Sequence, residues 1–188
     1  MMTELPTIWF VGDSWVFWLE SHARAQGDPN LSLPANVEWL GQRGMRWGQL
    51  IPLLESQKRL RVAPQVLLIH VGGNDLGFTK GSDLIHRVKY DLALVVALFP
   101  GAQVVFSNIC ERRVWMRGTC DAPGRLNQAR SHVNKAVDSY LRDMGMSFVR
   151  HTNLRRSMPV FRRDGVHLNP LGNSLLMANI IDVVKLVL

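Results

Sequence analysis

Short apolar segments alternate along the chain with longer amphipathic segments. This alternation predicts an α/β domain built around a mostly parallel sheet. The predicted strands are Thr7–Val11, Val37–Leu40, Val66–Val71, Val104–Ile109 and Ser147–Val149. The predicted helices are Trp15–Gln26, Trp47–Arg59, Ser82–Phe99, Leu126–Met144 and Pro170–Val187. Three of the strands are continuous runs of β-branched, aliphatic or aromatic residues, which favours a sheet with helices on both faces.

The 188 residues are enough for one well-formed core and too few for two comfortable domains. No linker, internal repeat or low-complexity tract interrupts them, so we expect residues 1–188 to form a single domain, either whole or excised from a larger protein. The longest apolar run, Leu92–Phe99, is far too short to span a membrane. The pattern of a secretory signal is absent, which favours an intracellular, cytoplasmic location.

Only two cysteines occur, Cys110 and Cys120, so the chain is not a disulfide scaffold. A single bridge between them is one alternative. Two reduced thiols are the other, and an intracellular location favours them.

The charge of the chain is unevenly distributed. The net charge is +7, and residues 110–163 hold 12 Lys and Arg against 4 Asp and Glu, whereas the remainder is nearly neutral. Such a basic segment suits an anionic partner, either nucleic acid or an acidic membrane surface. A solvated basic face explains the same charge without a partner, and no signature of a nucleic-acid-binding fold is present.

Ser14 stands where the first predicted strand turns into the first predicted helix, in the segment Gly12-Asp13-Ser14. Ligands of open α/β sheets bind at the carboxyl ends of strands. Glycine allows a tight turn, and the N–H groups of a helix start favour negative charge. Ser14 is therefore a candidate nucleophile, although serine and aspartate at such a position commonly do no more than cap a helix.

Two later segments offer groups that could stabilise an oxyanion. Gly44 follows the second predicted strand, where a glycine lets a backbone N–H approach a reacting oxygen. Asn74, in the segment Gly72-Gly73-Asn74-Asp75 after the third strand, carries an amide that can donate as a backbone N–H does. Ordinary turn chemistry explains each of these segments when it is taken alone.

A carboxylate and an imidazole lie close together in the segment Asp164-Gly165-Val166-His167. The carboxylate can fold back and accept from the imidazole, which fixes the tautomer and stabilises the imidazolium formed during catalysis. A single histidine is more often structural than catalytic. A metal site is less favoured, because no second histidine or cysteine stands at ligand spacing near His167.

Together the four segments resemble the sequence blocks of the SGNH (GDSL-like) hydrolase superfamily, and the resemblance spans essentially the whole chain. The matching positions are Gly12-Asp13-Ser14, Gly44, Gly72-x-Asn74-Asp75 and Asp164-x-x-His167. Trp15 stands where the superfamily usually has leucine, and Met45 and Arg46 stand where it usually has polar residues. The substrate pocket is therefore hard to infer from relatives.

The resemblance implies a flavodoxin-like, three-layer α/β/α sandwich around a five-stranded parallel sheet. It implies that Ser14 attacks an ester carbonyl, His167 accepts its proton and Asp164 orients His167. The oxyanion hole would consist of the backbone N–H groups of Ser14 and Gly44 and the side chain of Asn74. Neither a metal nor an organic cofactor is needed.

Two groups within the superfamily look most similar. The order and spacing of the blocks resemble the catalytic subunits of intracellular platelet-activating-factor acetylhydrolase. The segments RGMRWGQL, HVGGNDLG and RDGVHLN also resemble the esterase domain in the first open-reading-frame protein of LINE-type retrotransposons. Dimers occur in related folds.

We therefore expect a serine esterase that hydrolyses short acyl esters, acetyl esters first, with a lipid ester as one candidate substrate. A carbohydrate O-deacetylase is one alternative, and a basic binding module with the same fold is another. Trp15, Trp47 and Trp115 are candidates to narrow the pocket, although tryptophan more often fills a core. The loop Glu111–Gly124 is a candidate to set specificity, since long loops in compact domains are often functional.

Overall fold

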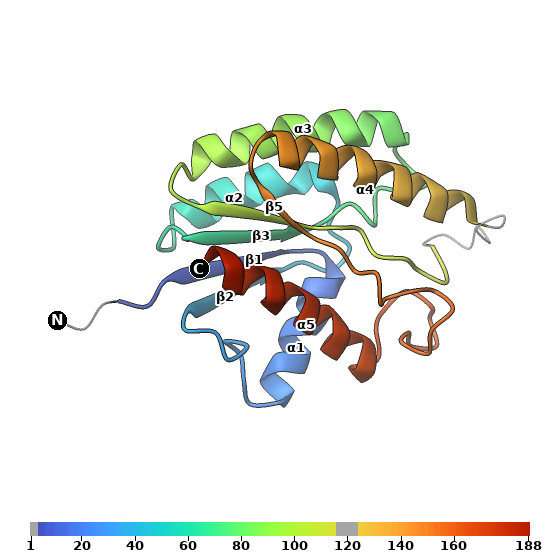
Figure 1. Ribbon diagram of the computed structural model, residues 1–188, viewed down its shortest axis with the longest axis horizontal. Helices are drawn as coiled ribbons and strands as arrows, with labels where there is room; N and C mark the ends of the chain where they lie inside the picture. Colours follow the sequence, from blue (N-terminus) through green and yellow to red (C-terminus); the bar gives the residue numbers. More distant parts are fainter. Residues whose placement is uncertain (1–3, 116–123) are drawn as a thin grey trace.

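In the computed structural model the chain forms a five-stranded parallel sheet between two layers of helices (Figure 1). The structure describes residues 4–115 and 124–188. The strands are β1 (Thr7–Gly12), β2 (Asn36–Gly41), β3 (Val66–His70), β4 (Gln103–Ser107) and β5 (Ser147–Val149). Their order across the sheet is β2-β1-β3-β4-β5, and every neighbouring pair is parallel. The predicted α/β/α sandwich is confirmed.

The helices divide between the two faces of the sheet. They are α1 (Ser14–Ala25), α2 (Leu50–Lys58), α3 (Gly81–Leu98), α4 (Arg125–Asp143) and α5 (Pro170–Val187). Figure 1 shows α1 and α5 on one side of the sheet and α2, α3 and α4 on the other. This arrangement explains why the central strands are apolar at every position, since both faces are covered.

Two apolar cores result, one on each face. Successive side chains of a strand point to opposite faces. In β1, Ile8 and Phe10 accordingly belong to the core beneath α1 and α5, and Trp9 and Val11 to the core beneath α2, α3 and α4. All four are completely buried, and each such side chain stabilises the fold by roughly 1.5–3 kcal/mol relative to an exposed one.

Two predicted elements differ from the observed ones by more than one residue at an end. The predicted helix Trp47–Arg59 divides into a 3₁₀ turn, η1 (Trp47–Gln49), and α2. Pro52 lies in the first turn of α2, where backbone N–H groups have no partner within the helix and proline is tolerated. Strand β4 ends two residues earlier than predicted, because the N–H of Ile109 donates to the side chain of Asn134 on α4 (3.0 Å).

The connectivity places a crevice at the carboxyl ends of β1 and β3. After β1 the chain crosses to β2 on one side, and it later returns to β3 on the other side of β1. Such a reversal leaves the loops after the two central strands free to diverge around a ligand. Ser14 is the first residue of α1, directly after the loop that follows β1, and Asn74 lies in the loop that follows β3.

Helix α5 is long and apolar enough, by length and composition alone, to span a membrane. Core helices pass the same test, and three of its aliphatic residues, Leu176, Ile180 and Val184, are buried in the core that it shares with α1. These contacts explain the apolar face of α5, because that face packs against the core.

Candidate active site

Asp13 and Ser14, at the start of α1, make different hydrogen bonds. Asp13 is the N-cap: its Oδ1 accepts from the N–H of Trp15 (2.9 Å), and its own N–H donates to the carbonyl of His70 at the end of β3 (3.1 Å). A cap of this kind stabilises a helix by about 1 kcal/mol. Because Asp13 does the capping, the hydroxyl of Ser14 is free to bond elsewhere.

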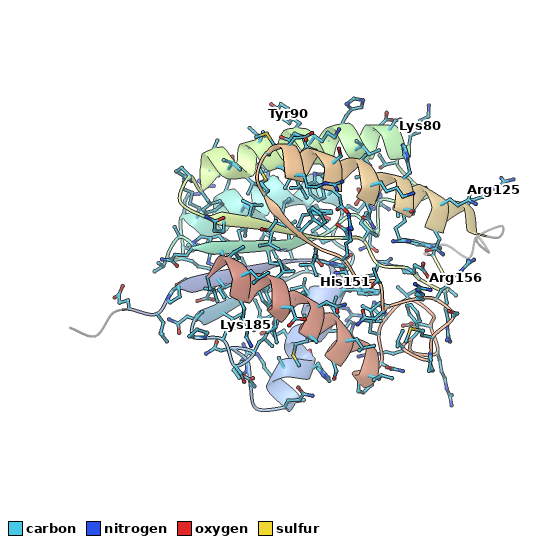
Figure 2. All side chains as sticks on the ribbon, viewed as in Figure 1. Lys80, Tyr90, Arg125, His151, Arg156 and Lys185 are labelled. Carbon is cyan, nitrogen blue, oxygen red and sulfur yellow. The ribbon has the colours of Figure 1, made fainter. Side chains whose placement is uncertain are left out.

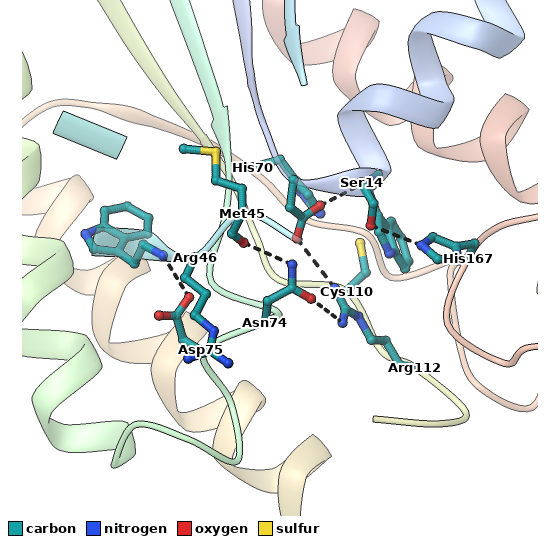
Figure 3. A network of polar contacts seen from close by, with 12 residues as sticks. Ser14, Met45, Arg46, His70, Asn74, Asp75, Cys110, Arg112 and His167 are labelled. Carbon is teal, nitrogen blue, oxygen red and sulfur yellow. Dashed lines mark hydrogen bonds and ion pairs between the residues drawn. The ribbon is translucent and has the colours of Figure 1, made fainter. Parts of the chain in front are cut away.

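That hydroxyl meets His167, which is 153 positions away in the sequence. Ser14 Oγ lies 3.1 Å from His167 Nε2, and His167 Nδ1 lies 2.7 Å from Asp164 Oδ2 (Figure 3 shows the first of these contacts). The carboxylate accepts a hydrogen bond from Nδ1–H, so Nε2 of the neutral ring is left to accept from the Ser14 hydroxyl. The structure thus brings together the three residues that the sequence singled out.

The Asp164 carboxylate is fixed by its own loop. Its second oxygen accepts from the N–H groups of Val166 and His167, both at 2.9 Å. Partial burial acts to raise the pKa of Asp164, but the hydrogen bonds from the His167 side chain and from the two N–H groups outweigh it, and the pKa is lowered. Asp164 is therefore a carboxylate at neutral pH, and it faces the imidazole of His167.

Two of the predicted oxyanion donors, Gly44 and Asn74, lie on loops that are bonded to each other. Asn74 Nδ2 donates to the carbonyl of Met45 (2.9 Å), and Asp75 Oδ2 accepts from the N–H of Trp47 (2.9 Å). Gly44 lies in the same turn, with φ at +74°, a conformation that favours glycine. Burial raises the pKa of Asp75, and the Trp47 N–H opposes that effect. These bonds hold the Gly44 turn against the Asn74 turn.

Arg112 is a member of this network that the sequence reasoning did not single out. Its side chain is buried, with Nη1 donating to Asn74 Oδ1 (3.0 Å) and Nη2 lying 3.5 Å from Asp13 Oδ2 (Figure 3). Burial raises the pKa of Asp13, and the nearby guanidinium opposes it. Nothing in the sequence distinguishes Arg112 from its exposed neighbour Arg113, so no pattern could have identified it.

The three tryptophans proposed to narrow the pocket are core residues. Trp15, Trp47 and Trp115 are 2%, 1% and 1% exposed, so their rings fill the interior and offer a substrate no open surface. An aromatic side chain next to His167 is instead Trp18, whose ring lies edge-on to that of His167 with centroids 6.3 Å apart. Trp18 lies one helical turn after Ser14, a spacing that would have indicated it.

A second polar cluster lies behind the site. The donor atoms of His70, Cys110 and His151 are within 4.8 Å of one another, a spacing that could surround a metal ion. The two histidines belong to a hydrogen-bonded chain: Asn179 Nδ2 donates to His151 Nδ1, and Ser107 Oγ bridges His151 Nε2 and His70 Nδ1, at 2.8 Å from each. Cys110 is outside this chain, and its Sγ lies 3.7 Å from the carbonyl of Asn108. Burial lowers the pKa of both imidazoles to about 3 and raises that of the Cys110 thiol. The two imidazoles are thus neutral, and they are held by hydrogen bonds to Ser107 and Asn179.

A cavity of about 560 Å³ opens beside this cluster, between α4 and the loops that follow β4 and β5. His151, labelled in Figure 2, lies on its wall and is half-buried. The polar and charged lining residues are Asn108, Glu111, Arg130, Ser131, Asn134, Lys135, Asp138, Arg150, His151, Thr152 and Arg155. Ser14, Asp164 and His167 do not line it, so the chemistry and this cavity lie apart.

Two predictions fall on residues that the structure does not describe. Cys110 is buried with a free thiol, while Cys120 lies outside the described residues, so the alternative of a bridge between them stays a prediction. Residues 116–123 of the predicted specificity loop also lie outside them.

Comparison with known proteins gives a family and a fold. The model of the GDSL-like lipase/acylhydrolase family matches residues 5–175. No curated protein matches the sequence.

Among solved structures, a GDSL-like lipase from Bacteroides thetaiotaomicron is similar, with 16% identity, coverage of 97% of this chain and 89% of that one, and a TM-score of 0.70. A candidate platelet activating factor from Streptococcus pneumonia has 18% identity, coverage of 96% and 84%, and a TM-score of 0.72. The psychrotrophic esterase EstA from Pseudoalteromonas sp., in a structure inhibited by monoethylphosphonate, has 14% identity, coverage of 96% and 97%, and a TM-score of 0.67. At these identities the likenesses show the shared fold.

Proposed function

The chain belongs to the GDSL-like lipase/acylhydrolase family and is a serine esterase, and on that premise we propose that Ser14 is its nucleophile, His167 its general base and Asp164 the residue that orients the base. One observation carries the assignment: the continuous hydrogen-bonded chain from Ser14 Oγ through the His167 ring to Asp164. In serine hydrolases this geometry, and not the position in the sequence, identifies a triad.

The reaction follows from these contacts. Ser14 Oγ attacks the ester carbonyl carbon while its proton moves to His167 Nε2. The tetrahedral intermediate collapses, and the imidazolium gives that proton to the departing alcohol, which leaves an acyl group on Ser14. Water then attacks the acyl group by the same route and releases the acid. The Asp164 carboxylate stabilises the imidazolium in both halves.

The developing oxyanion needs preorganised donors close to Ser14. The backbone N–H groups of Ser14 and Gly44 and the side chain of Asn74 are the proposed donors. Asn74 Nδ2 carries two hydrogens and gives one of them to the Met45 carbonyl, so the second is available to the oxyanion. Within the described residues, no acceptor is bonded to the N–H of Ser14 or of Gly44.

The first test is hydrolysis of p-nitrophenyl esters from acetate to octanoate by the wild type and by Ser14→Ala. We expect the variant to lose activity by at least about a thousandfold, as other serine hydrolases do. Ser21→Ala, on the exposed part of the same helix, is the matched control. A phosphonate ester should add to the wild type and to Ser21→Ala, but not to Ser14→Ala, by intact-protein mass. Equal hydrolysis by Ser14→Ala and wild type would remove the triad assignment.

The substrate is proposed to be a short acyl ester, with acetyl as the first candidate. The resemblance of the sequence blocks to platelet-activating-factor acetylhydrolase supports an acetyl group. Lipid esters, which the likeness to retrotransposon esterase domains suggests, and acetylated carbohydrates remain the two candidate classes. Acetate release from phospholipids that carry an acetyl ester and from acetylated sugars, measured side by side, separates them.

A further inference from the structure

Arg112 has no part in the triad, yet its side chain is buried against the proposed oxyanion hole. We propose that Arg112 is a positioning residue that holds and polarises the amide of Asn74. This inference rests on the proposed function, because it concerns how Asn74 presents a hydrogen to the oxyanion. The contact that carries it joins Arg112 Nη1 and Asn74 Oδ1, 3.0 Å apart.

The two partners of Asn74 fix the rotation of its amide. Oδ1 accepts from Arg112, while one hydrogen of Nδ2 goes to the Met45 carbonyl. In the reversed orientation Nδ2 would face the guanidinium, with donor against donor, and Oδ1 would face a carbonyl, with acceptor against acceptor. Arg112 and Met45 therefore exclude the flipped amide, and the direction of the second N–H is determined by the plane of the group.

The charge of Arg112 adds a second effect. A guanidinium on the amide oxygen draws electron density from the nitrogen, so the remaining N–H becomes a stronger donor. The effect is greatest where water is excluded, and both Arg112 and Asn74 are buried. Arg112 thus acts on the oxyanion through Asn74 without touching the substrate.

The surroundings of Arg112 keep its guanidinium in place. Asp13 Oδ2 lies 3.5 Å from Nη2, and the rings of Trp15 and Trp115 lie 6.0 and 5.3 Å from the guanidinium carbon. Gly73 makes room for it, because a Cβ there would lie 2.5 Å from Nη2. Burial lowers the pKa of Arg112, and the Asp13 carboxylate opposes that effect. Gly73 therefore leaves space for the Arg112 guanidinium, which orients Asn74.

A double-mutant cycle tests whether Arg112 acts through Asn74. Loss of one oxyanion donor costs about 10²–10³ in kcat, so we expect Asn74→Ala to fall in that range and Arg112→Met to lose roughly 10–100-fold with little change in KM. In the Asn74→Ala background, Arg112→Met should cost little more, because its effect passes through the missing amide. Multiplied losses in the double variant, or an unchanged kcat in Arg112→Met, would overturn the proposal.

Two further variants separate positioning from mere structural support. Arg112→Lys keeps a charge, but a single ammonium cannot replace the planar fork that reaches both Asn74 and Asp13, so it should retain an intermediate kcat. It also keeps the test open if Arg112→Met does not fold. Arg150→Met breaks another Arg–Asp contact, with Asp138, outside the site and should leave kcat unchanged.

Ser14→Ala, measured in parallel, keeps the two hypotheses apart: if it retains activity, the proposed function fails, whatever Arg112→Met does.

Discussion

At the scale of single residues, the site depends on two carboxylates with opposite surroundings. Asp13 is buried, bonded to the backbone of α1 and close to Arg112, so it supports the geometry of the nucleophile's turn. Asp164 is 46% exposed in its side chain and is held by three hydrogen bonds within its own loop. One carboxylate places the helix that carries Ser14, and the other sets the tautomer of His167.

Replacement of Asp164 by asparagine tests the second of these functions. An amide at this position can present N–H to the ring and favour the wrong tautomer of His167, so kcat should fall on the order of 10³-fold. The measurement is kcat for p-nitrophenyl acetate, with the urea midpoint as a control for folding. A loss below about tenfold would show that the carboxylate does not orient the base.

The buried His70 and the half-buried His151 should make the free energy of unfolding depend on pH. The pKa of each is about 3 in the fold, because burial disfavours the imidazolium, against an ordinary value of 6.5. Between these values the unfolded chain binds protons that the folded chain does not. The free energy of unfolding is therefore highest above pH 6.5 and falls as the pH drops towards 3, by up to about 1.4 kcal/mol per pH unit for each histidine.

Urea unfolding at several pH values between 7 and 4 measures this slope. His151→Gln should give a shallower slope than the wild type, because one of the two groups no longer binds a proton on unfolding. His132→Gln, on the exposed side of α4, is the control. An unchanged slope in His151→Gln would mean that this histidine is already protonated in the fold.

At the scale of elements, the position of the nucleophile depends on how closely α1 crosses the ends of β1 and β2. Gly12 and Gly41 are paired in the sheet register, and α1 passes directly over them. A Cβ on Gly12 would lie 2.3 Å from the carbonyl oxygen of His70, and one on Gly41 would lie 2.4 Å from the backbone nitrogen of Phe17. The absence of two side chains thus allows the start of α1 to reach the crevice.

We expect Gly41→Ala to destabilise the fold, because backbone atoms of α1 would have to move. Overpacking of this kind costs roughly 1–3 kcal/mol and occasionally more, and activity should fall with it as Ser14 moves. Gly101→Ala is the matched control, since a Cβ there meets open space. Urea midpoints of the two variants give the comparison. Equal stability would show that α1 can shift without strain.

Sequence patterns predicted the strands and the chemistry more reliably than the pocket. The run Val66–Val71 and the segment Gly12-Asp13-Ser14 carry local signals, namely apolar continuity and a glycine turn, so they could be interpreted from the sequence. The role proposed for Arg112 depends on which neighbours the fold brings to it, and no local pattern records that. Trp15, Trp47 and Trp115 illustrate the same limit, because an apolar ring suits a pocket and a core equally well.

At the scale of the whole molecule, much of the basic charge in residues 110–163 has intramolecular partners. Arg113 donates to the carbonyls of Arg156 and Met158, Arg130 donates to that of Ile109, and Arg162 donates to that of Leu168. These arginines hold the loops at the carboxyl edge of the sheet by hydrogen bonds to their backbone carbonyls. An anionic partner remains a proposal for the exposed arginines, and salt-dependent binding to single-stranded RNA or acidic liposomes is its test.

The long separation between Ser14 and His167 also bears on folding. Ser14 and the strands β1, β2 and β3 belong to the first half of the chain, whereas His167 lies just before α5, the last helix in the sequence. The contact between Ser14 and His167 therefore requires that this late segment has docked against the start of α1. In a refolding experiment, ester hydrolysis would report the formation of that contact, whereas tryptophan fluorescence, to which buried rings of both cores contribute, would report the burial of the cores.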